Sequence, residues 1–517
     1  MRSMRSPKAE GSSVMVCEAT AEEGARRSRA SPFPGFRLVT VRRKTKIIAT
    51  LGPAIDSSSG IKELIEQGMN VARLNFSHGA QDDHRKRFEW VRAEAEELGV
   101  PIAIMQDIQG PKIRVGTFSG GRAILEPGSE VTLIAGEGEG DGSRIFVAYL
   151  ESVRLEVGHP IVLSDGLISL EVVAVDDGEA TARVIDGGEL LDQKGVAFPA
   201  SLNEIPVITN KDEEDLAFGR ELGVDLIAAS FVQRGQDLRD VRKFAGDIPI
   251  IAKIESAAGY ANLDDILVEA DGAMVARGDL GVELSLQSVP RAQREILALT
   301  NAAAKISITA TEMLESMTTS PRPTRAEVTD VYRSVLDGTD AVMLSAETAI
   351  GSYPAAAIRA MDIICREAEQ SPDYGRAPEV SQLDDRSRFA SAIAEASVDS
   401  ADRLDLHTIV GFTESGSTAR LLSKYRPRAD IYAFTALPAT YRAMSILGGV
   451  TPLMFEREDS TDEMISRAER HLLDAGIVAP GEGLVMVAGI PPNQRASTNI
   501  MKLHEVGSTV SGVPGGT

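Results

Sequence analysis

Short apolar runs recur along the middle of this 517-residue chain, and most of them end in polar or charged residues. The segments between them, such as 59–68 and 84–99, carry apolar residues at helical spacing. Strands that alternate with helices in this way predict a (β/α)8 TIM barrel. A doubly wound open sheet would give a similar period, and the count of eight favours the barrel. The eight runs are 46–52, 71–77, 102–107, 226–231, 250–255, 273–279, 306–312 and 341–347.

This alternation is interrupted between Lys112 and about Asn203, where apolar and polar residues alternate between Gly and Asp turns. We interpret this stretch as a small β-barrel lid domain, since loops on the catalytic face of a barrel accept insertions. After about Ser371 a polar linker leads to further strand–helix units, which predict a smaller α/β domain. The expected domains are 42–111 with 204–371 for the barrel, 112–203 for the inserted β lid and 372–513 for the C-terminal α/β domain.

Residues 1–41 differ from the rest of the chain, because they are rich in Ser, Arg, Ala and Gly without a steady apolar period. A transit peptide would be basic and poor in acids, whereas four glutamates lie here. We therefore expect a disordered extension, or a start codon assigned too far upstream.

Composition narrows the possible partners. The formal net charge of −22 argues against nucleic acid as the main partner, but a local basic cluster could still bind phosphate. Cys17 and Cys365 are the two cysteines, which excludes a disulfide framework and a thiolate metal site. No apolar run approaches the roughly 18 residues of a membrane helix. We expect a soluble cytoplasmic protein.

The segment 250–283 carries the strongest functional signal. Lys253 and Glu255 are two residues apart on a predicted strand, so their side chains should share one face and point into the barrel mouth. Arg277 and Asp279 close the next strand. Buried charges need partners, so these residues form either a functional site or a structural ion-pair network, and we favour function. Two carboxylates beside a lysine can hold Mg²⁺ and a transferring phosphoryl group.

Other strand ends carry candidate ligands, each with a structural alternative. Arg73 could clamp a phosphate, while Asn75 and Ser77 offer oxygens to a cation or cap the next helix. Asp107 is followed by Lys112 and Arg114, and this combination suits a phosphate site that also binds a metal ion. The alternative is a turn into the insertion that carries surface charge. Thr311 could position water or a substrate carboxylate, or cap a helix.

The C-terminal region contributes a hydroxyl-rich segment, 413–418, at the start of a predicted helix. Free backbone N–H groups at such a position can bind an anion, although ordinary capping is an equally good interpretation.

Longer strings make the chain resemble the pyruvate kinase family from about Arg43 to Val506. These strings include TKIIATLGP, ARLNFSHG, DIQGPKIR, MVARGDLGVE, ITATEMLESM and VMLSAETAIGSYP, in the order found in the family. The resemblance implies transfer of a phosphoryl group from phosphoenolpyruvate to ADP, which gives ATP and pyruvate in the last step of glycolysis. It also implies a homotetramer and an allosteric C-terminal domain that binds a phosphorylated effector.

The resemblance also assigns roles to individual residues. Glu255 and Asp279 would bind Mg²⁺ or Mn²⁺, and Lys253 would stabilise charge on the phosphoryl group during transfer. Arg73 and Thr311 would join Lys253 as catalytic residues. The substrate contacts would be Arg73, Gly278, Asp279 and Thr311; the nucleotide contacts Arg114, Lys194, His78 and Asn75; and the effector-phosphate contacts Thr413, Ser415, Ser417 and Thr418.

One departure concerns a second cation. In K⁺-dependent members, Asn75, Ser77, Asp107 and the carbonyl of Ile108 form a monovalent-cation site, with Glu at the position of Lys112. This chain instead resembles the K⁺-independent branch. Because a fixed ammonium can supply the missing charge, we expect activity with Mg²⁺ or Mn²⁺ and little or no need for K⁺.

Two other functions remain open from the sequence. A phosphoenolpyruvate-using lyase on the same fold would not need a nucleotide site in the insertion. A non-catalytic regulator could retain the fold for metabolite binding, although the intact lysine, carboxylates and threonine weigh against it. Milder departures are Ile306 and Glu312, which stand where proline and glutamine are usual in the family.

Overall fold

A computed structural model describes most of the chain beyond the N-terminal segment. The prediction of a disordered extension at 1–41 lies outside the described residues. The described ranges are 43–176, 178–199, 205–375, 380–381, 385–490 and 498–508.

Eight parallel strands form a closed barrel, which confirms the predicted fold class. β1 pairs with β18 on one side and with β2 on the other, and this closes the ring. Nearly every strand residue is buried, because the interior fills one face of each strand and helices cover the other. The strands are β1 (Lys46–Leu51), β2 (Val71–Asn75), β3 (Ala103–Asp107), β14 (Leu226–Ala229), β15 (Ile250–Ile254), β16 (Gly272–Ala276), β17 (Ile306–Ala310) and β18 (Ala341–Leu344).

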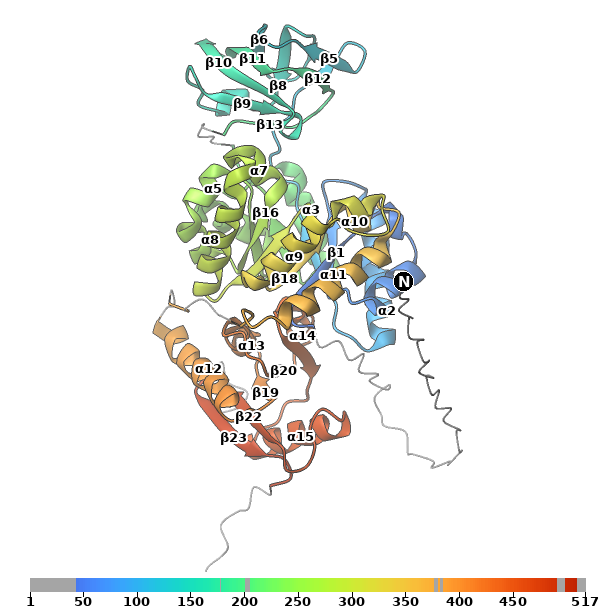
Figure 1. Ribbon diagram of the computed structural model, residues 1–517, viewed down its shortest axis with the longest axis vertical. Coiled ribbons are helices and arrows are strands. Elements are labelled where there is room, and N and C mark those ends of the chain that lie inside the picture. Colours follow the sequence, from blue (N-terminus) through green and yellow to red (C-terminus); the bar gives the residue numbers. More distant parts are fainter. Residues whose placement is uncertain are drawn as a thin grey trace, which may run out of the picture. The chain divides into compact units, whose positions relative to one another are not determined.

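Helices cover the outside of this barrel, as α8, α9 and α11 show in Figure 1. Their ends follow local capping rules: Thr324 caps α9 and its hydroxyl accepts the Glu327 N–H, while Glu327 bonds back to Thr324. The main helices are α1 (Ser58–Glu66), α2 (Gln81–Leu98), α3 (Asn210–Leu222), α4 (Gly235–Ala245), α6 (Leu263–Glu269), α8 (Val289–Ala302), α9 (Arg325–Leu336) and α11 (Pro354–Glu369), with shorter α5 (Ala257–Ala261), α7 (Arg277–Leu284) and α10 (Ala346–Ala349).

The alternation of side chains along each strand divides the barrel core in two. Ile47 and Ala49 belong to the cluster beneath the helices, whereas Ile48 belongs to the cluster that fills the barrel interior. Met105 and Met274 also fill the interior. Apolar packing therefore holds every strand on both faces, and the polar strand ends are left free for other roles.

Between β3 and α3 the chain forms mostly antiparallel β-sheets with a hydrophobic cluster of their own. The largest sheet has the order β13-β9-β10-β11-β6-β8. Burial alternates along β11, as the alternating sequence predicts. The strands are β4 (Thr117–Phe118), β5 (Arg122–Leu125), β6 (Glu130–Ala135), β7 (Glu139–Gly140), β8 (Arg144–Val147), β9 (Pro160–Leu163), β10 (Ile168–Asp176), β11 (Glu179–Asp186), β12 (Gly188–Leu191) and β13 (Val196–Ala197), and the turn η3 covers Ser164–Gly166.

The C-terminal part of the chain forms a five-stranded sheet in the order β21-β20-β19-β22-β23, in which only β23 runs antiparallel to its neighbour. This is the α/β architecture expected there. Its elements are α12 (Asp385–Arg403), β19 (Thr408–Phe412), α13 (Ser417–Lys424), β20 (Asp430–Thr435), α14 (Pro438–Ala443), β21 (Val450–Met454), α15 (Thr461–Asp474), β22 (Gly483–Ala488) and β23 (Ile500–Glu505).

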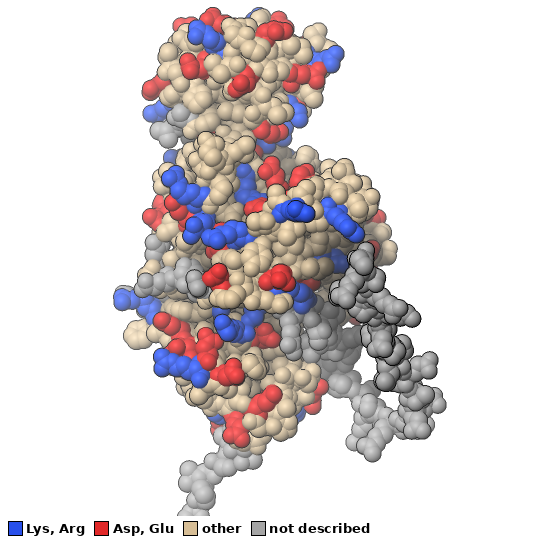
Figure 2. Space-filling model, viewed as in Figure 1, with Lys and Arg blue, Asp and Glu red and all other residues tan. Residues whose placement is uncertain are grey.

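Two further features of the described residues concern the surface charge and the lengths of the helices. Figure 2 shows acidic and basic groups interspersed over the visible face of the described residues. None of the helices that the structure describes has the length and apolar character needed to span a membrane.

Candidate active site

Charged side chains converge where the barrel strands end. The Lys253 ammonium lies 3.0 Å from Glu255 Oε1 and 3.2 Å from Asp107 Oδ1. It also donates a hydrogen bond of 2.7 Å to Ser230 Oγ. These residues come from the ends of β3, β14 and β15, so the parallel sheet brings together groups that are far apart in sequence.

Arg73, in the middle of β2, completes the inner part of this cluster. Its Nε lies 2.7 Å from Asp107 Oδ2, and Nη1 donates to Thr50 Oγ1 at 3.0 Å. Burial opposes ionisation of Asp107, but Arg73 and Lys253 outweigh it and hold the pKa of that carboxyl below its usual value. Despite burial, Asp107 and Glu255 raise the pKa of Lys253. The ammonium is therefore charged at neutral pH and fixed in place.

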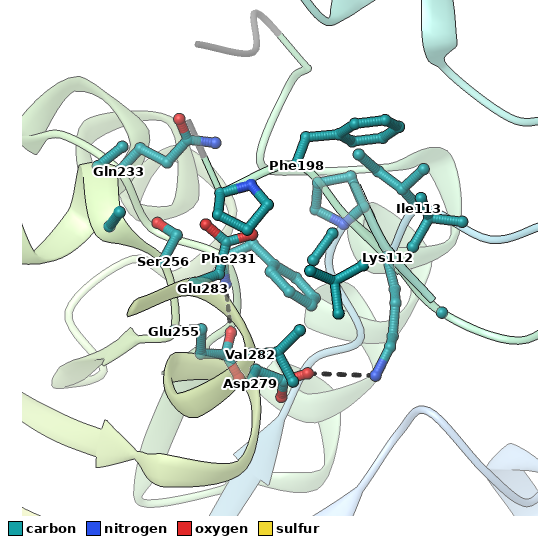
Figure 3. A pocket seen from close by; sticks show the side chains of 18 of the residues that line it. Lys112, Ile113, Phe198, Phe231, Gln233, Glu255, Ser256, Asp279, Val282 and Glu283 are labelled. Atoms are coloured by element: carbon teal, nitrogen blue, oxygen red, sulfur yellow. Dashed lines mark hydrogen bonds and ion pairs between the residues drawn. The ribbon is translucent and has the colours of Figure 1, made fainter. Parts of the chain in front are cut away.

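Glu255 and Asp279 form the outer, more acidic part. Glu255 Oε2 accepts the Phe231 N–H at 2.6 Å, and Lys112 Nζ lies 3.3 Å from Asp279 Oδ1, as Figure 3 shows. Burial raises the pKa of Glu255 and the charge of Asp279 adds to this, although Lys253 opposes it. Since the ionised form of Glu255 is disfavoured in this way, a further cation beside it would stabilise that form.

The donor set fits a divalent ion. Among the residues that the structure describes, no three His, Cys, Asp or Glu side chains form a group suited to a metal. Mg²⁺, however, is usually held by one or two carboxylates, with water and substrate phosphate as its other ligands. Glu255 and Asp279 supply two such carboxylates, and the Asp279 side chain is 37% exposed and accessible to a ligand.

Thr311 has an unusual backbone at the end of β17. Its φ of 65° lies in the left-handed region, which costs free energy for a β-branched residue. Its hydroxyl accepts the Gly278 N–H at 2.8 Å and donates to Ala310 O at 2.7 Å. Arg277 Nη2 donates to Thr311 O at 2.5 Å, and Nη1 pairs with Asp330 at 2.5 Å. Arg277 thus supports the Thr311 backbone, while Asp279 of the same motif faces the cluster.

The nucleotide residues implied by the resemblance fall into two groups. Arg114 and Lys194 lie on adjoining segments of the inserted domain, where Val115 N–H donates to Lys194 O at 3.0 Å. Arg114 itself donates to a backbone carbonyl, that of Gln193. Asn75 ends β2 at the barrel mouth, and the exposed His78 follows three residues later.

The oxygens implied for a monovalent cation are largely engaged by the protein. Ser230 Oγ donates to Ile108 O at 2.7 Å, and Asn75 Oδ1 accepts the Ser77 N–H at 3.2 Å. Asp107 is paired with two cationic side chains, as described above. Lys112 pairs with Asp279, so its ammonium lies beside the candidate metal ligands.

The segment proposed for an effector phosphate precedes α13. Thr413 Oγ1 accepts the Gly416 N–H at 2.9 Å, and Ser415 Oγ donates to Ser417 Oγ at 3.1 Å. Thr418 is buried, and its hydroxyl bonds with that of Thr498. Gly416, which has no side chain, is the N-cap of α13, and the hydroxyl that accepts a backbone N–H at the start of this helix is that of Thr413.

Two residues near the cluster were missed at the sequence level. Ser230 lies within the fourth apolar run and directly follows β14, and its position at a strand end could have identified it. Glu283 lies within α7 and ends the string MVARGDLGVE, which gave it no role of its own. In Figure 3 its carboxylate lies near Phe231 and Ser256 at a cavity of about 90 Å³ that Glu255 and Asp279 also line.

Fold and site together define a class. A TIM barrel whose strand ends gather a fixed ammonium, a guanidinium and two carboxylates is an enzyme scaffold suited to a phosphoryl group and a divalent metal.

Comparisons with known proteins identify the family. The family model "Pyruvate kinase, barrel domain" matches residues 42–358, and "Pyruvate kinase, alpha/beta domain" matches 391–504. The chain is 42% identical to the pyruvate kinase of Staphylococcus saprophyticus and 43% identical to that of Bacillus licheniformis, over 91% of this chain and 81% of each relative. It matches the crystal structure of a pyruvate kinase from Cryptosporidium parvum with a TM-score of 0.84 and 34% identity, over 91% of this chain and 98% of that one.

The chain belongs to the pyruvate kinase family, and it is a phosphotransferase. Membership implies phosphoenolpyruvate, ADP or ATP and pyruvate as substrates and products, and a divalent metal in general.

Proposed function

We propose that this enzyme transfers the phosphoryl group of phosphoenolpyruvate to ADP with Mg²⁺ or Mn²⁺, and that it does so without K⁺. The observation that carries the proposal is the fixed ammonium of Lys253 between Asp107 and Glu255, beside Asp279. Phosphoryl transfer needs positioned charge more than a protein nucleophile, and this cluster provides positioned charge.

Each charged residue has a distinct part in the proposal. Glu255 and Asp279 would hold the divalent ion, which when bound neutralises charge on phosphate and enolate oxygens. Lys253 stabilises the phosphoryl group during transfer. Its contacts to two carboxylates and Ser230 hold the ammonium at one place, so little reorganisation is needed as charge develops.

Substrate would be held by Arg73, the Gly278 backbone, Asp279 and Thr311. Arg73 is preoriented by Asp107 and Thr50, which lowers the entropy cost of binding a phosphate. The hydroxyl of Thr311 would lie near the substrate carboxylate and the carbon that is protonated, held there by the supported backbone described above.

The nucleotide would lie between the barrel mouth and the inserted domain, in contact with Asn75, His78, Arg114 and Lys194. In this proposal, residues 112–203 act as a lid on the barrel formed by 42–111 and 204–371. Residues 372–513 form a regulatory domain, in which Thr413, Ser415, Ser417 and Thr418 contact an effector phosphate. The placement of Arg114 and Lys194 on adjoining segments supports a shared role for them.

Independence from K⁺ is supported by charge already present. Arg73 and Lys253 neutralise Asp107, and Lys112 places an ammonium 3.3 Å from Asp279 Oδ1. A monovalent cation would add charge where the protein supplies its own, so its binding would gain little.

A coupled assay of pyruvate release tests the reaction. We expect turnover that requires ADP, stops when EDTA removes the divalent metal and returns when Mg²⁺ is added in excess. Pyruvate release without ADP would reject the kinase and favour the lyase, and absence of turnover under all conditions would favour a non-catalytic regulator.

Assembly, regulation and cellular location also belong to the proposal. We infer a cytoplasmic homotetramer of glycolysis whose C-terminal domain binds a phosphorylated effector. Light scattering after size-exclusion chromatography tests the tetramer, and kinetics with a panel of phosphorylated metabolites test the effector site.

A further inference from the structure

The segment 311–316, which follows β17, begins with a strained backbone. Thr311 and Glu312 have φ values of 65° and 52°, so two successive residues with side chains lie in the left-handed region. Such a conformation persists only where the surrounding structure holds it. The Thr311 hydroxyl accepts the Gly278 N–H from this segment, so the place of that hydroxyl depends on how the segment is held.

Side chains from several other segments hold this one in place. Arg277 supports its first residue, as described above. Glu327 of α9 holds its end, because the carboxylate accepts the Ser316 N–H at 2.7 Å and the Ser316 hydroxyl at 2.6 Å. Glu347 of α10 holds its middle, where Oε1 accepts the Leu314 N–H at 3.0 Å. The contact of Glu347 is the one made deepest in the protein.

Glu347 is completely buried, and both of its oxygens accept a backbone N–H. Oε1 reaches Leu314, while Oε2 accepts the Ser345 N–H at 2.7 Å. Ser345 directly follows β18, so this one side chain joins the chain segments that leave two neighbouring barrel strands. A buried carboxylate needs such donors, and removal of an acceptor oxygen would leave a buried N–H unpaired.

The short helix that carries Glu347 is itself fixed against β1. Thr348 Oγ1 donates to Thr50 O at 2.9 Å. The backbones also approach closely, since a Cβ at Gly52 would lie 2.5 Å from Ala349 O. Glu347 therefore extends from a part of α10 that cannot shift easily, and it ties the segment 311–316 to that fixed point.

We propose that Glu347 is a positioning residue for Thr311, because it fixes the middle of the segment whose first residue carries the Thr311 hydroxyl. This inference rests on the proposed function, in which that hydroxyl lies near the substrate carboxylate and the carbon that is protonated. The structural alternative is that Glu347 only satisfies two buried N–H groups, since Met313 and Leu314 already pack in the hydrophobic core. The two interpretations differ in their effect on turnover.

A double-mutant cycle separates these interpretations. Glu347→Gln keeps the side-chain size but has one acceptor oxygen, so one of the two N–H groups loses its partner. Thr311→Val keeps the shape of the side chain and removes its hydroxyl. Both single variants and the double variant are made in the full chain and compared by the coupled assay. Hydrogen exchange with mass spectrometry follows the peptides that contain Leu314 and Ser345.

Asp340→Asn is the matched control for a loss of stability. Asp340 is also completely buried and accepts a backbone N–H from β17, that of Ser307 at 2.9 Å, but at the amino end of the strand. This variant should be less stable, with kcat within about threefold of the wild type. Glu214→Gln, which changes an exposed glutamate on α3, should match the wild type throughout.

We expect kcat of Glu347→Gln to fall about tenfold or more, because the Thr311 hydroxyl is no longer held in place. The KM for ADP should stay within about twofold, since no nucleotide contact is touched. In the Thr311→Val background the same change should lower kcat by less than about twofold, because the hydroxyl is already absent. Exchange at Leu314 or Ser345 should be about tenfold faster or more.

Equal losses of kcat in both backgrounds would show that Glu347 acts independently of Thr311 and would overturn the proposal. Wild-type kcat in Glu347→Gln, even with the stability loss of Asp340→Asn, would show a purely structural carboxylate and would overturn it too. If Glu347→Gln does not fold, Glu347→Asp decides by the same criteria, because it keeps the charge and shortens the reach. Failure of the wild type to form pyruvate would instead overturn the proposed function, while exchange at Leu314 would still show whether Glu347 holds the segment.

Discussion

The two ends of the barrel both bury charge, but they use it differently. At the carboxyl end, Lys253 lies among Asp107, Glu255 and Ser230. At the amino end, three aspartates immediately precede β14, β16 and β18, and each accepts a backbone N–H from a neighbouring strand. The three pairs are Asp225 with Ile104, Asp271 with Ile250 and Asp340 with Ser307.

The amino-end aspartates also take cationic partners. Asp340 pairs with Lys424 and, at 2.8 Å, with Arg426, both from the C-terminal part of the chain. Asp225 pairs with Arg442 at 2.8 Å. Although burial opposes it, Lys424 and Arg426 hold the pKa of Asp340 below its usual value, while burial lowers the pKa of Lys424 to about 8. Both members of the Asp340–Lys424 pair are therefore charged at neutral pH.

Access and backbone strain distinguish the two ends. Asp340 and Lys424 are fully buried, whereas the Asp279 and Lys112 side chains are 37% and 30% exposed. The carboxyl end also contains the left-handed backbone of Thr311. Buried charge alone therefore does not identify a site. Charge that a ligand can reach, beside a strained backbone, is the better indicator.

The largest expected effect comes from removal of the carboxyl-end ammonium. Lys253→Met should lower kcat by on the order of 10³-fold or more, because a fixed charge at the phosphoryl group is lost. The melting temperature should change little, since Asp107 keeps Arg73 and Glu255 keeps the Phe231 N–H. Calorimetry and the coupled assay measure both quantities.

The exposed Lys86 on α2 provides the control for this change. Lys86→Met should leave kcat unchanged. Wild-type turnover in Lys253→Met would contradict the catalytic role of Lys253. Buried charge at the carboxyl end would then have no more part in catalysis than buried charge at the amino end.

The matching change at the amino end should affect stability instead. Asp340→Asn leaves Lys424 buried without its full counter-charge, so the melting temperature should fall by roughly 5–10 °C. At a temperature where the variant is folded, kcat should stay within about threefold of the wild type, because no reacting group is touched.

Asp82→Asn, at an exposed position of α2, is the matched control and should not shift the melting temperature. A large loss of kcat in folded Asp340→Asn would show that the amino end contributes to catalysis and would break the contrast.

A smaller effect is expected for the second cation. The wild type should gain less than about twofold from K⁺, whereas Lys112→Gln should be slower in tetramethylammonium salts and partly restored by K⁺. The reason is that the variant lacks the ammonium beside Asp279. Rates at constant ionic strength measure this, and Lys86→Gln serves as control. Strong K⁺ stimulation of the wild type would contradict the proposal.

The smallest effect is a pH dependence from Glu283. Its pKa is about 7 in the folded state, against an ordinary value of 4.5, so between pH 4.5 and 7 the folded state holds a proton that the unfolded state has released. This group's contribution to stability is therefore present below about pH 4.5 and is lost as pH rises through 7. The melting temperature of Glu283→Gln relative to the wild type should increase from pH 5 to pH 8.

Glu214→Gln is the control; it changes an exposed glutamate on α3 and should show no such trend. A constant difference between Glu283→Gln and the wild type across this pH range would show that the carboxyl is not perturbed.

Much of the fold followed from sequence because its signals are local. Eight apolar runs with helical segments between them predict a barrel, and alternation along β15 predicts that Lys253 and Glu255 share a face. Spacing within a strand fixes which side chains reach the barrel mouth, so the core of the site could be predicted.

The rest depended on tertiary contacts that spacing does not encode. Arg277 and Asp279 belong to one motif, yet Arg277 turns to Asp330 and the Thr311 backbone while Asp279 faces Lys112. Glu283 comes to line a cavity beside Phe198 only when the inserted domain returns to the barrel. Rotamers and long-range hydrogen bonds set these contacts, and they appear only in three dimensions.

The central claim is that the carboxyl-end cluster moves a phosphoryl group from phosphoenolpyruvate to ADP. Phosphorus-31 NMR of the wild type with both substrates, Mg²⁺ and no K⁺ tests it most directly. The account predicts that the phosphoenolpyruvate signal is replaced by the γ-phosphorus of ATP, and that it persists when ADP is omitted. Release of inorganic phosphate, or loss of the phosphoenolpyruvate signal without ADP, would contradict it.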